Sequence, residues 1–302
     1  MKTKPDSARA AGEPLEWRLS HSFVFEDQQV AYDVHGKGPA VVLVHGTPWS
    51  SFSWRKVIAA LARHHTVYFY DLLGFGQSRK HAGQDVSLRV QGKLLARLME
   101  HWTLVRPMVV GHDFGGTTVL RSHLLEGIEY AKMVLVDPVA VGPWGSPFFK
   151  HVRIHEPAFS GVPPYIHAAM LEAYVRGAMH KPPQPEVLAG ILRPWLTEEG
   201  QAAFYRQIAQ ADQQYTDEIE PLYGAITFKP LLVWGEEDAW VPIAKGRALN
   251  KMIPGSILIT VPAAGHLVQE DAPQVLADIL VKYFDACCET GSVNARHRPD
   301  RP

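Results

Sequence analysis

Residues 108–118 read MVVGHDFGGTT, an apolar run that ends at an acid placed between small residues. The apolar part predicts a buried strand, and the glycines predict a sharp turn into a helix. A nucleophile elbow has this spacing, because its strained turn needs small neighbours and presents one side chain at a helix N-terminus. The side chain presented here is the carboxylate of Asp113.

An aspartate at this position restricts the chemistry. A carboxylate that attacks a saturated carbon forms an alkyl ester, and water can then attack the ester carbonyl. A serine would form an ether with the same carbon, which the same groups could not reopen. Asp is also a favoured N-cap residue, so this stretch alone fits an ordinary strand-to-helix cap as well. The choice depends on what the rest of the chain supplies to Asp113.

The composition is that of an ordinary globular enzyme. The 302 residues are 46% hydrophobic and 20% charged, with a formal net charge of -1, and they suffice for one large domain with an insertion. The near-zero charge argues against nucleic acid or an anionic membrane as the partner. Two vicinal cysteines, Cys287 and Cys288, cannot form a disulfide framework, and no apolar run is long enough to cross a bilayer. We expect a cytoplasmic monomer or homodimer.

Buried strands alternate with helices along much of the chain. A hairpin is predicted over residues 21–33, and amphipathic helices over 50–64 and 86–102. Besides the elbow strand, the predicted strands cover 40–44, 66–70, 132–136, 229–234 and 256–261. This alternation predicts an α/β fold, with a mostly parallel twisted sheet flanked by helices and functional groups at the carboxyl ends of its strands.

The alternation stops over residues 139–228, which are rich in proline, aromatic residues and short helical stretches. A structureless loop of that length would be unusual, so we expect an inserted helical cap that roofs the elbow and excludes water. The core then comprises residues 14–138 and 229–288. The end segments, 1–13 and 289–302, are rich in charged, small and proline residues and are expected to be disordered.

An elbow nucleophile needs an acid and then a histidine later in the chain. Asp238 lies in the loop after strand 229–234, and His266 follows strand 256–261 in a Gly-His turn. We expect His266 to deprotonate the water that hydrolyses the ester, while Asp238 orients the imidazole and stabilises its protonated form. Asp137, at the end of strand 132–136, is the alternative acid.

The stretch His45-Gly46-Thr47-Pro48 follows the first buried strand, where an elbow enzyme draws one donor of its oxyanion hole. The N–H groups of Thr47 and Phe114 are expected to face the tetrahedral intermediate formed on Asp113. The side chains expected to contact the substrate are His45, Trp49, Trp144, Tyr165 and Tyr174.

Taken in order, these motifs resemble the aspartate-nucleophile branch of the α/β-hydrolase fold, which contains epoxide hydrolases, haloalkane dehalogenases and fluoroacetate dehalogenases. The resemblance covers roughly residues 20–285 and implies an α/β-hydrolase core with an inserted helical cap. It implies a hydrolase whose partners are a small apolar organic substrate and water. We expect no cofactor and no metal, because neither a metal-binding spacing nor a dinucleotide fingerprint is present.

The leaving group separates the members of this branch. The oxygen of an opening epoxide needs a proton, which the family supplies from cap tyrosines. Residues 204–208 (FYRQI) resemble a segment that carries one of them, which implies Tyr205 as the donor, with Tyr165 or Tyr174 as a second. Opening of an epoxide to a diol is therefore the first expectation.

Dehalogenation is the second expectation. Haloalkane dehalogenases use a tryptophan directly after the nucleophile, where this chain has Phe114, although Trp49, Trp144 or Trp195 could supply an indole N–H instead. Residues 51–58 (SFSWRKVI) look more like that group. A ligand-binding protein with low turnover is the third expectation, and the full set of Asp113, Asp238 and His266 argues against it.

Overall fold

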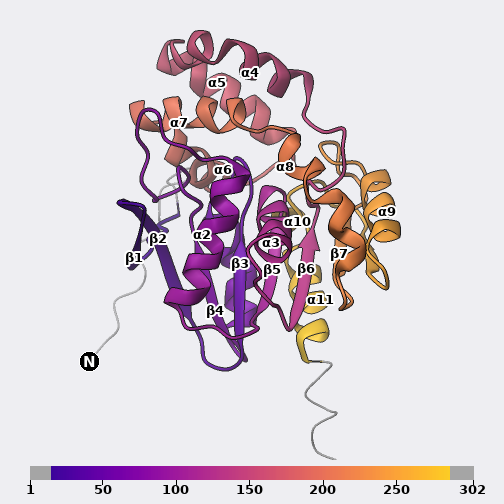
Figure 1. Ribbon diagram of the computed structural model, residues 1–302. Helices are drawn as coiled ribbons and strands as arrows, with labels where there is room; N and C mark the ends of the chain where they lie inside the picture. Colours follow the sequence, from indigo (N-terminus) through magenta and orange to yellow (C-terminus); the bar gives the residue numbers. More distant parts are fainter. Residues whose placement is uncertain (1–14, 286–302) are drawn as a thin grey trace, which may run out of the picture.

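The structure is a computed structural model, and it describes residues 15–285. Its centre is an eight-stranded sheet with the strand order β1-β2-β4-β3-β5-β6-β7-β8 (Figure 1). The first two strands form the predicted hairpin and pair antiparallel, and every pairing from β4 through β8 is parallel. The end segments expected to be disordered, together with Cys287 and Cys288, lie outside the described residues.

The strands follow the apolar runs of the sequence. Alternate residues of a strand point to opposite faces, and Val42 and Val44 accordingly pack in one core cluster while Val41 and Leu43 pack in the other. The strands are β1 His21–Phe25, β2 Gln28–His35, β3 Ala40–Val44, β4 Thr66–Tyr70, β5 Met108–His112, β6 Lys132–Val136, β7 Leu231–Gly235 and β8 Ile257–Val261. The central strands are buried on both faces, as the predicted parallel sheet requires.

Helices cover both faces of the sheet. Leu94 and Leu249 pack in the first core cluster, whereas Leu61 and Leu280 pack in the second. The core helices are α1 Arg55–Leu61, which follows the short 3-10 helix η1 Ser51–Trp54, then α2 Leu88–His101, α3 Phe114–Leu124, α9 Ile243–Met252, α10 Val268–Asp271 and α11 Pro273–Asp285. This arrangement confirms the predicted mostly parallel sheet flanked by helices.

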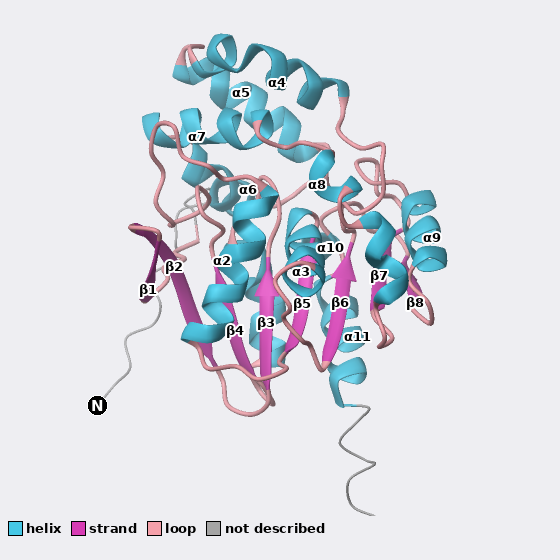
Figure 2. Ribbon diagram, in the orientation of Figure 1, coloured by secondary structure: helices cyan, strands magenta, loops and turns pink. Residues whose placement is uncertain are grey.

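Between β6 and β7 the described chain forms helices and no strand. These cap helices gather beyond the end of the sheet toward which the strand arrows point (Figure 2). Proline, which fits the first turn of a helix, begins three of them. They are α4 Pro147–Ser160, α5 Pro164–Arg176, α6 Pro185–Leu192, η2 Arg193–Trp195, α7 Glu198–Ala209, α8 Gln214–Asp217 and η3 Glu220–Ala225. The loops at the carboxyl ends of the strands therefore face the cap.

The elbow helix α3 lies directly against the end of β3. A Cβ added at Gly115 would lie 2.3 Å from the carbonyl oxygen of Val44 and 2.5 Å from that of His45. Both obstacles are backbone atoms, which cannot move aside without displacing the strand. Gly115 thus lets the helix approach closely enough to hold the elbow over β3.

We predict that Gly115→Ala lowers the free energy of unfolding by about 1–3 kcal/mol, because the added methyl group overpacks this contact. Gly224→Ala is the matched control, since a Cβ at Gly224 meets nothing within 4 Å, and it should change stability by less than about 0.5 kcal/mol. Urea unfolding of the two variants measures both effects. Equal stability of the two variants would contradict the tight approach of α3 to β3.

Candidate active site

Asp113 occupies a strained turn between β5 and α3. Its backbone has φ 54 and ψ -122, a conformation that costs a non-glycine residue free energy and is typical of functional sites. Its N–H donates to the carbonyl of Val136 at 3.2 Å, and its own carbonyl accepts the N–H of Gly116 at 3.0 Å. The side chain is 4% exposed. This is the geometry expected of a nucleophile elbow.

The structure brings Asp113, His266 and Asp238 into one hydrogen-bonded row. His266 Nε2 lies 3.1 Å from Asp113 Oδ2, and His266 Nδ1 lies 2.8 Å from Asp238 Oδ2. The other oxygen of Asp238 accepts the N–H groups of Trp240 and Val241, both at 2.8 Å. Because these bonds fix the Asp238 carboxylate, it can fix the imidazole in turn.

The two carboxylates control the charge of His266. Burial alone would lower the pKa of its imidazole, but the charge of Asp238, followed by the hydrogen bond and charge of Asp113, raises that pKa well above the usual value. The imidazole is therefore protonated while both carboxylates are free. The histidine of this row becomes a base only after one of them loses its charge.

Asp137, the alternative acid, does not bond His266. It follows β6 with φ 41 and is fully buried. One carboxyl oxygen accepts the N–H of Gly235 at 2.9 Å, and the other has no hydrogen-bond partner in the described chain. Burial, and then the charge of Asp238, raises the pKa of Asp137 well above its usual range. Asp137 is therefore the neutral member of the pair, and Asp238 is the acid that is hydrogen-bonded to His266.

The second oxygen of Asp113 lies against the loop after β3. The N–H of Thr47 donates to Asp113 Oδ1 at 2.6 Å. A Cβ at Gly46 would lie 2.2 Å from the same oxygen, so glycine is required at this approach. The structure thus places the Thr47 donor as expected. The Phe114 N–H makes no hydrogen bond to that carboxylate within residues 15–285, so its role as the second oxyanion donor stays a prediction.

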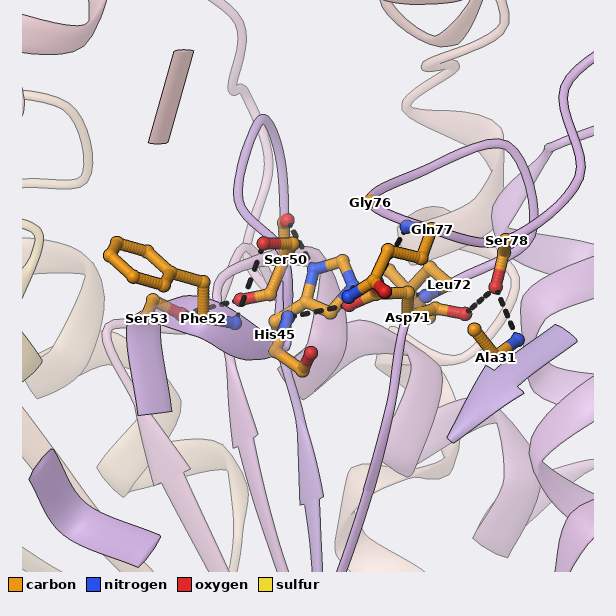
Figure 3. Close-up of polar contacts among 12 residues, drawn as sticks. Ala31, His45, Ser50, Phe52, Ser53, Asp71, Leu72, Gly76, Gln77 and Ser78 are labelled. Carbon is orange, nitrogen blue, oxygen red and sulfur yellow. Dashed lines mark hydrogen bonds and ion pairs between the residues drawn. The ribbon is translucent and has the colours of Figure 1, made fainter. Parts of the chain in front are cut away.

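His45 supports this loop and does not line the cavity, which corrects the substrate-contact prediction. Its Nε2 accepts the N–H of Leu72 at 2.9 Å, so the proton sits on Nδ1 and is donated to the Gly46 carbonyl at 2.9 Å (Figure 3). Burial lowers the pKa of the imidazole, which keeps it neutral. The bond to Gly46 holds the backbone next to the Thr47 donor.

A buried carboxylate, Asp71, anchors the neighbouring loops. It accepts the N–H groups of Ser51 and Gln77, both at 2.7 Å, and its backbone carbonyl accepts the Ser78 hydroxyl at 2.6 Å (Figure 3). These bonds join the loops that follow β3 and β4. The hydrogen bonds of Asp71 therefore stabilise the loop that carries the Thr47 donor. The sequence did not indicate this polar network.

A cavity of about 540 Å³ separates the elbow from the cap. Its size is in the range of small-molecule sites. Its wall is mostly apolar and aromatic, and it includes Asp113, Phe114, Trp144, Tyr174, Trp240 and Lys245. The nucleophile candidate therefore opens onto a space suited to an apolar organic molecule.

Tyr174 is the tyrosine of this cavity. Its ring stacks on Trp240, with 4.5 Å between centroids, and Trp240 in turn lies 5.2 Å from the His266 ring. No residue in the described chain makes a hydrogen bond to the Tyr174 hydroxyl. Burial, and then the charge of Asp113, raises its pKa well above the usual value. The hydroxyl is therefore protonated and available to a ligand beside Asp113.

The other two predicted tyrosines lie elsewhere. Tyr205 is fully buried and does not line the cavity. His167 Nε2 donates to the Trp195 carbonyl at 3.0 Å, so its Nδ1 accepts the Tyr205 proton at 3.0 Å. Tyr165 is 74% exposed on α5. These placements do not fit the predicted roles, because one hydroxyl is committed to a histidine and the other faces solvent.

Three tryptophans were expected as possible hydrogen-bond donors to a leaving halide, and the structure shows where each indole N–H lies. Trp144 lines the cavity, but its indole N–H donates to the Thr216 hydroxyl at 2.8 Å. The Trp195 N–H donates to the Pro48 carbonyl at 2.7 Å. Trp49 is buried behind Trp240, with 5.8 Å between their rings, and does not line the cavity. The cavity tryptophan that sequence reasoning missed is Trp240, for which its place two residues after Asp238 was the available signal.

The profile of the alpha/beta hydrolase family matches residues 41–279. The chain belongs to this family. An alpha/beta hydrolase fold protein from Burkholderia ambifaria is 48% identical, with a TM-score of 0.86, over 89% of this chain and 100% of its own. The uncharacterized hydrolase YugF of Bacillus subtilis is 29% identical over 87% of this chain and 96% of its own. Haloalkane dehalogenase 2 of Mycobacterium tuberculosis is 26% identical over 85% and 91%.

Family membership agrees with the predicted α/β-hydrolase fold and identifies the chain as an alpha/beta hydrolase. Neither the substrate nor the nucleophile follows from membership alone. Within residues 15–285, no helix combines the length and the apolar character needed to cross a bilayer.

We predict that Asp137→Asn stabilises the protein at neutral pH. Folding raises the pKa of this carboxyl. Such a group makes its full contribution to the free energy of unfolding below its pKa in the unfolded chain, about 3.9, and that contribution is lost as the pH rises toward its pKa in the folded protein. Wild type should therefore lose up to about 1.4 kcal/mol per pH unit in this window relative to the asparagine variant, which carries no such proton.

Urea unfolding of both proteins between pH 4 and pH 8 measures this difference. The Asn side chain keeps an acceptor for the Gly235 N–H, and its NH2 group replaces the O–H donor of the protonated carboxyl, so the fold is preserved. A difference in stability that does not change with pH would show that Asp137 is ionised in the folded protein.

Proposed function

We propose that the protein is a hydrolase that opens epoxides to diols through an ester on Asp113. The observation that supports it is one mostly apolar cavity lined by both Asp113 and Tyr174, whose hydroxyl has no hydrogen-bond partner among residues 15–285. The first group is a nucleophile for a saturated carbon, and the second is a proton donor for the oxygen that leaves it.

In the first step, the Asp113 oxygen that is not bound to Thr47 attacks a ring carbon. A carbon–oxygen bond of the epoxide breaks, and the Tyr174 hydroxyl gives its proton to the released oxygen. The oxygen held by the Thr47 N–H becomes the ester carbonyl. This donor stays in place when the tetrahedral intermediate forms and stabilises its negative charge.

The second step follows from the charge of His266. Formation of the ester removes the negative charge of Asp113, which is one of the two groups that raise the pKa of His266. The imidazolium then loses its proton more easily and gives it to the Tyr174 oxygen, and the neutral imidazole deprotonates the water molecule that attacks the ester. That proton stays on His266 and the second water proton passes to the released oxygen of the diol, so Tyr174, His266 and Asp113 return to their starting states.

Dehalogenation is the second candidate. The similarity to haloalkane dehalogenase 2 favours it, and it needs the same Asp113, His266 and Asp238. A halide leaves without a proton but needs N–H donors. Two of the three tryptophan N–H groups considered for this role are bonded to protein acceptors, and Trp49 lies outside the cavity wall. Tyr174, which offers a proton donor in the cavity, therefore favours epoxide opening over dehalogenation.

We predict that His266→Gln traps the ester, because it removes the base of the second step and leaves the nucleophile. The variant is incubated with panels of epoxides and of haloalkanes, and the peptide that contains Asp113 is then weighed by mass spectrometry. An adduct with epoxides supports the first proposal, and an adduct with haloalkanes and halide release supports the second. Absence of any adduct would reject both.

We predict that Tyr174→Phe slows epoxide opening by about 10²-fold or more, since a positioned general acid contributes at least that much. Tyr205→Phe is the matched control, because its hydroxyl bonds His167 outside the cavity. The rate of adduct formation in the His266→Gln background reports the first step alone. If Tyr205→Phe slowed this step and Tyr174→Phe did not, the assignment would be reversed.

A further inference from the structure

The wall of the Asp113 cavity contains one cationic side chain. Of the residues that line it, only Asp113 and Lys245 carry a charge, and the others are apolar or neutral. Lys245 lies in the first turn of α9 and is partly buried. An apolar substrate would gain nothing from an ammonium group at this place.

The Lys245 ammonium is incompletely partnered. Its Nζ donates to the Gly142 carbonyl at 2.7 Å, which uses one of the three donors of an ammonium group. No carboxylate of the described residues forms an ion pair with it, Asp113 included. The remaining donors of the ammonium group and its positive charge are therefore free to bind an anion in the cavity.

A second source of positive potential lines the same cavity. Helix α4 begins at Pro147, and both Pro147 and its N-cap Ser146 belong to the wall. A helix N-terminus carries a partial positive charge and favours anions. Lys245 and the start of α4 therefore act in the same direction on a bound ligand.

We propose that the substrate carries a carboxylate, which pairs with Lys245 while its reactive carbon lies at Asp113. The proposal rests on the function proposed above and narrows the substrate to epoxides of organic acids. A singly charged group matches the single cation of the wall. A phosphate would bring about two negative charges into a cavity that already holds Asp113. The apolar wall between the charged groups accommodates the carbon chain.

The first test measures binding without reaction. Pentanoate and pentanamide have the same shape and differ in charge, so isothermal titration calorimetry with each probe isolates the contribution of the carboxylate. We expect pentanoate to bind wild type at least about tenfold more tightly than pentanamide. Lys245→Met should abolish this difference and Lys245→Arg should retain it, whereas Lys251→Met, in the last turn of the same helix, should leave it unchanged.

The second test measures turnover of an epoxy acid and of its primary amide. We expect wild type to prefer the acid about tenfold in kcat/KM, and Lys245→Met to lose this preference through a higher KM for the acid alone. Equal binding of pentanoate and pentanamide to wild type would overturn the role of Lys245, even if both epoxides were opened. Preferential binding of pentanoate with no epoxide opened would instead overturn the proposed reaction and leave the anion site standing.

Discussion

The hydrogen bond from the Thr47 N–H to Asp113 is the interaction on which the site depends. Asp113 is 3% exposed, and a buried charge is tolerated only where it is bonded. One oxygen is held by Thr47 at 2.6 Å and the other by His266 at 3.1 Å. The loop after β3, the elbow after β5 and the turn after β8 must therefore meet at one point, and the parallel sheet makes this possible by aligning their strand ends.

The polar groups behind the site serve the same requirement. His112 Nε2 donates to the His266 carbonyl at 2.9 Å, which ties the histidine turn to the residue that precedes the nucleophile. From the cap, Gln207 accepts the Thr47 hydroxyl at 2.6 Å. Each group that is proposed to act in catalysis is thus fixed by a partner on another element. Donors that are already fixed in place can stabilise a negative charge as it develops, because they need not reorient during the reaction.

Sequence reasoning succeeded where local pattern determines position. Apolar runs located the strands, and the order of Asp113, Asp238 and His266 followed from their places after strands. It failed in the cap, since α7 buries residues around much of its circumference and periodicity cannot tell which face meets the core. Gln207 reaches the loop after β3, whereas Tyr205 faces His167. Lys245 could not be found either, because a lysine on a helix of the core ordinarily faces solvent.

Asp137 and Asp238, which follow β6 and β7, differ in charge because two ionised carboxylates buried side by side would repel each other. If Asp137 and Asp238 were both ionised, two buried negative charges would face one imidazolium, and Asp113 would add a third. Burial and the charge of Asp238 together keep the proton on Asp137, so the row holds one cation between two anions. In the proposed reaction, esterification of Asp113 leaves His266 with Asp238 as its one charged partner. The neutrality of Asp137 ensures that this single change of charge lowers the pKa of His266, because no second free carboxylate remains to hold the proton.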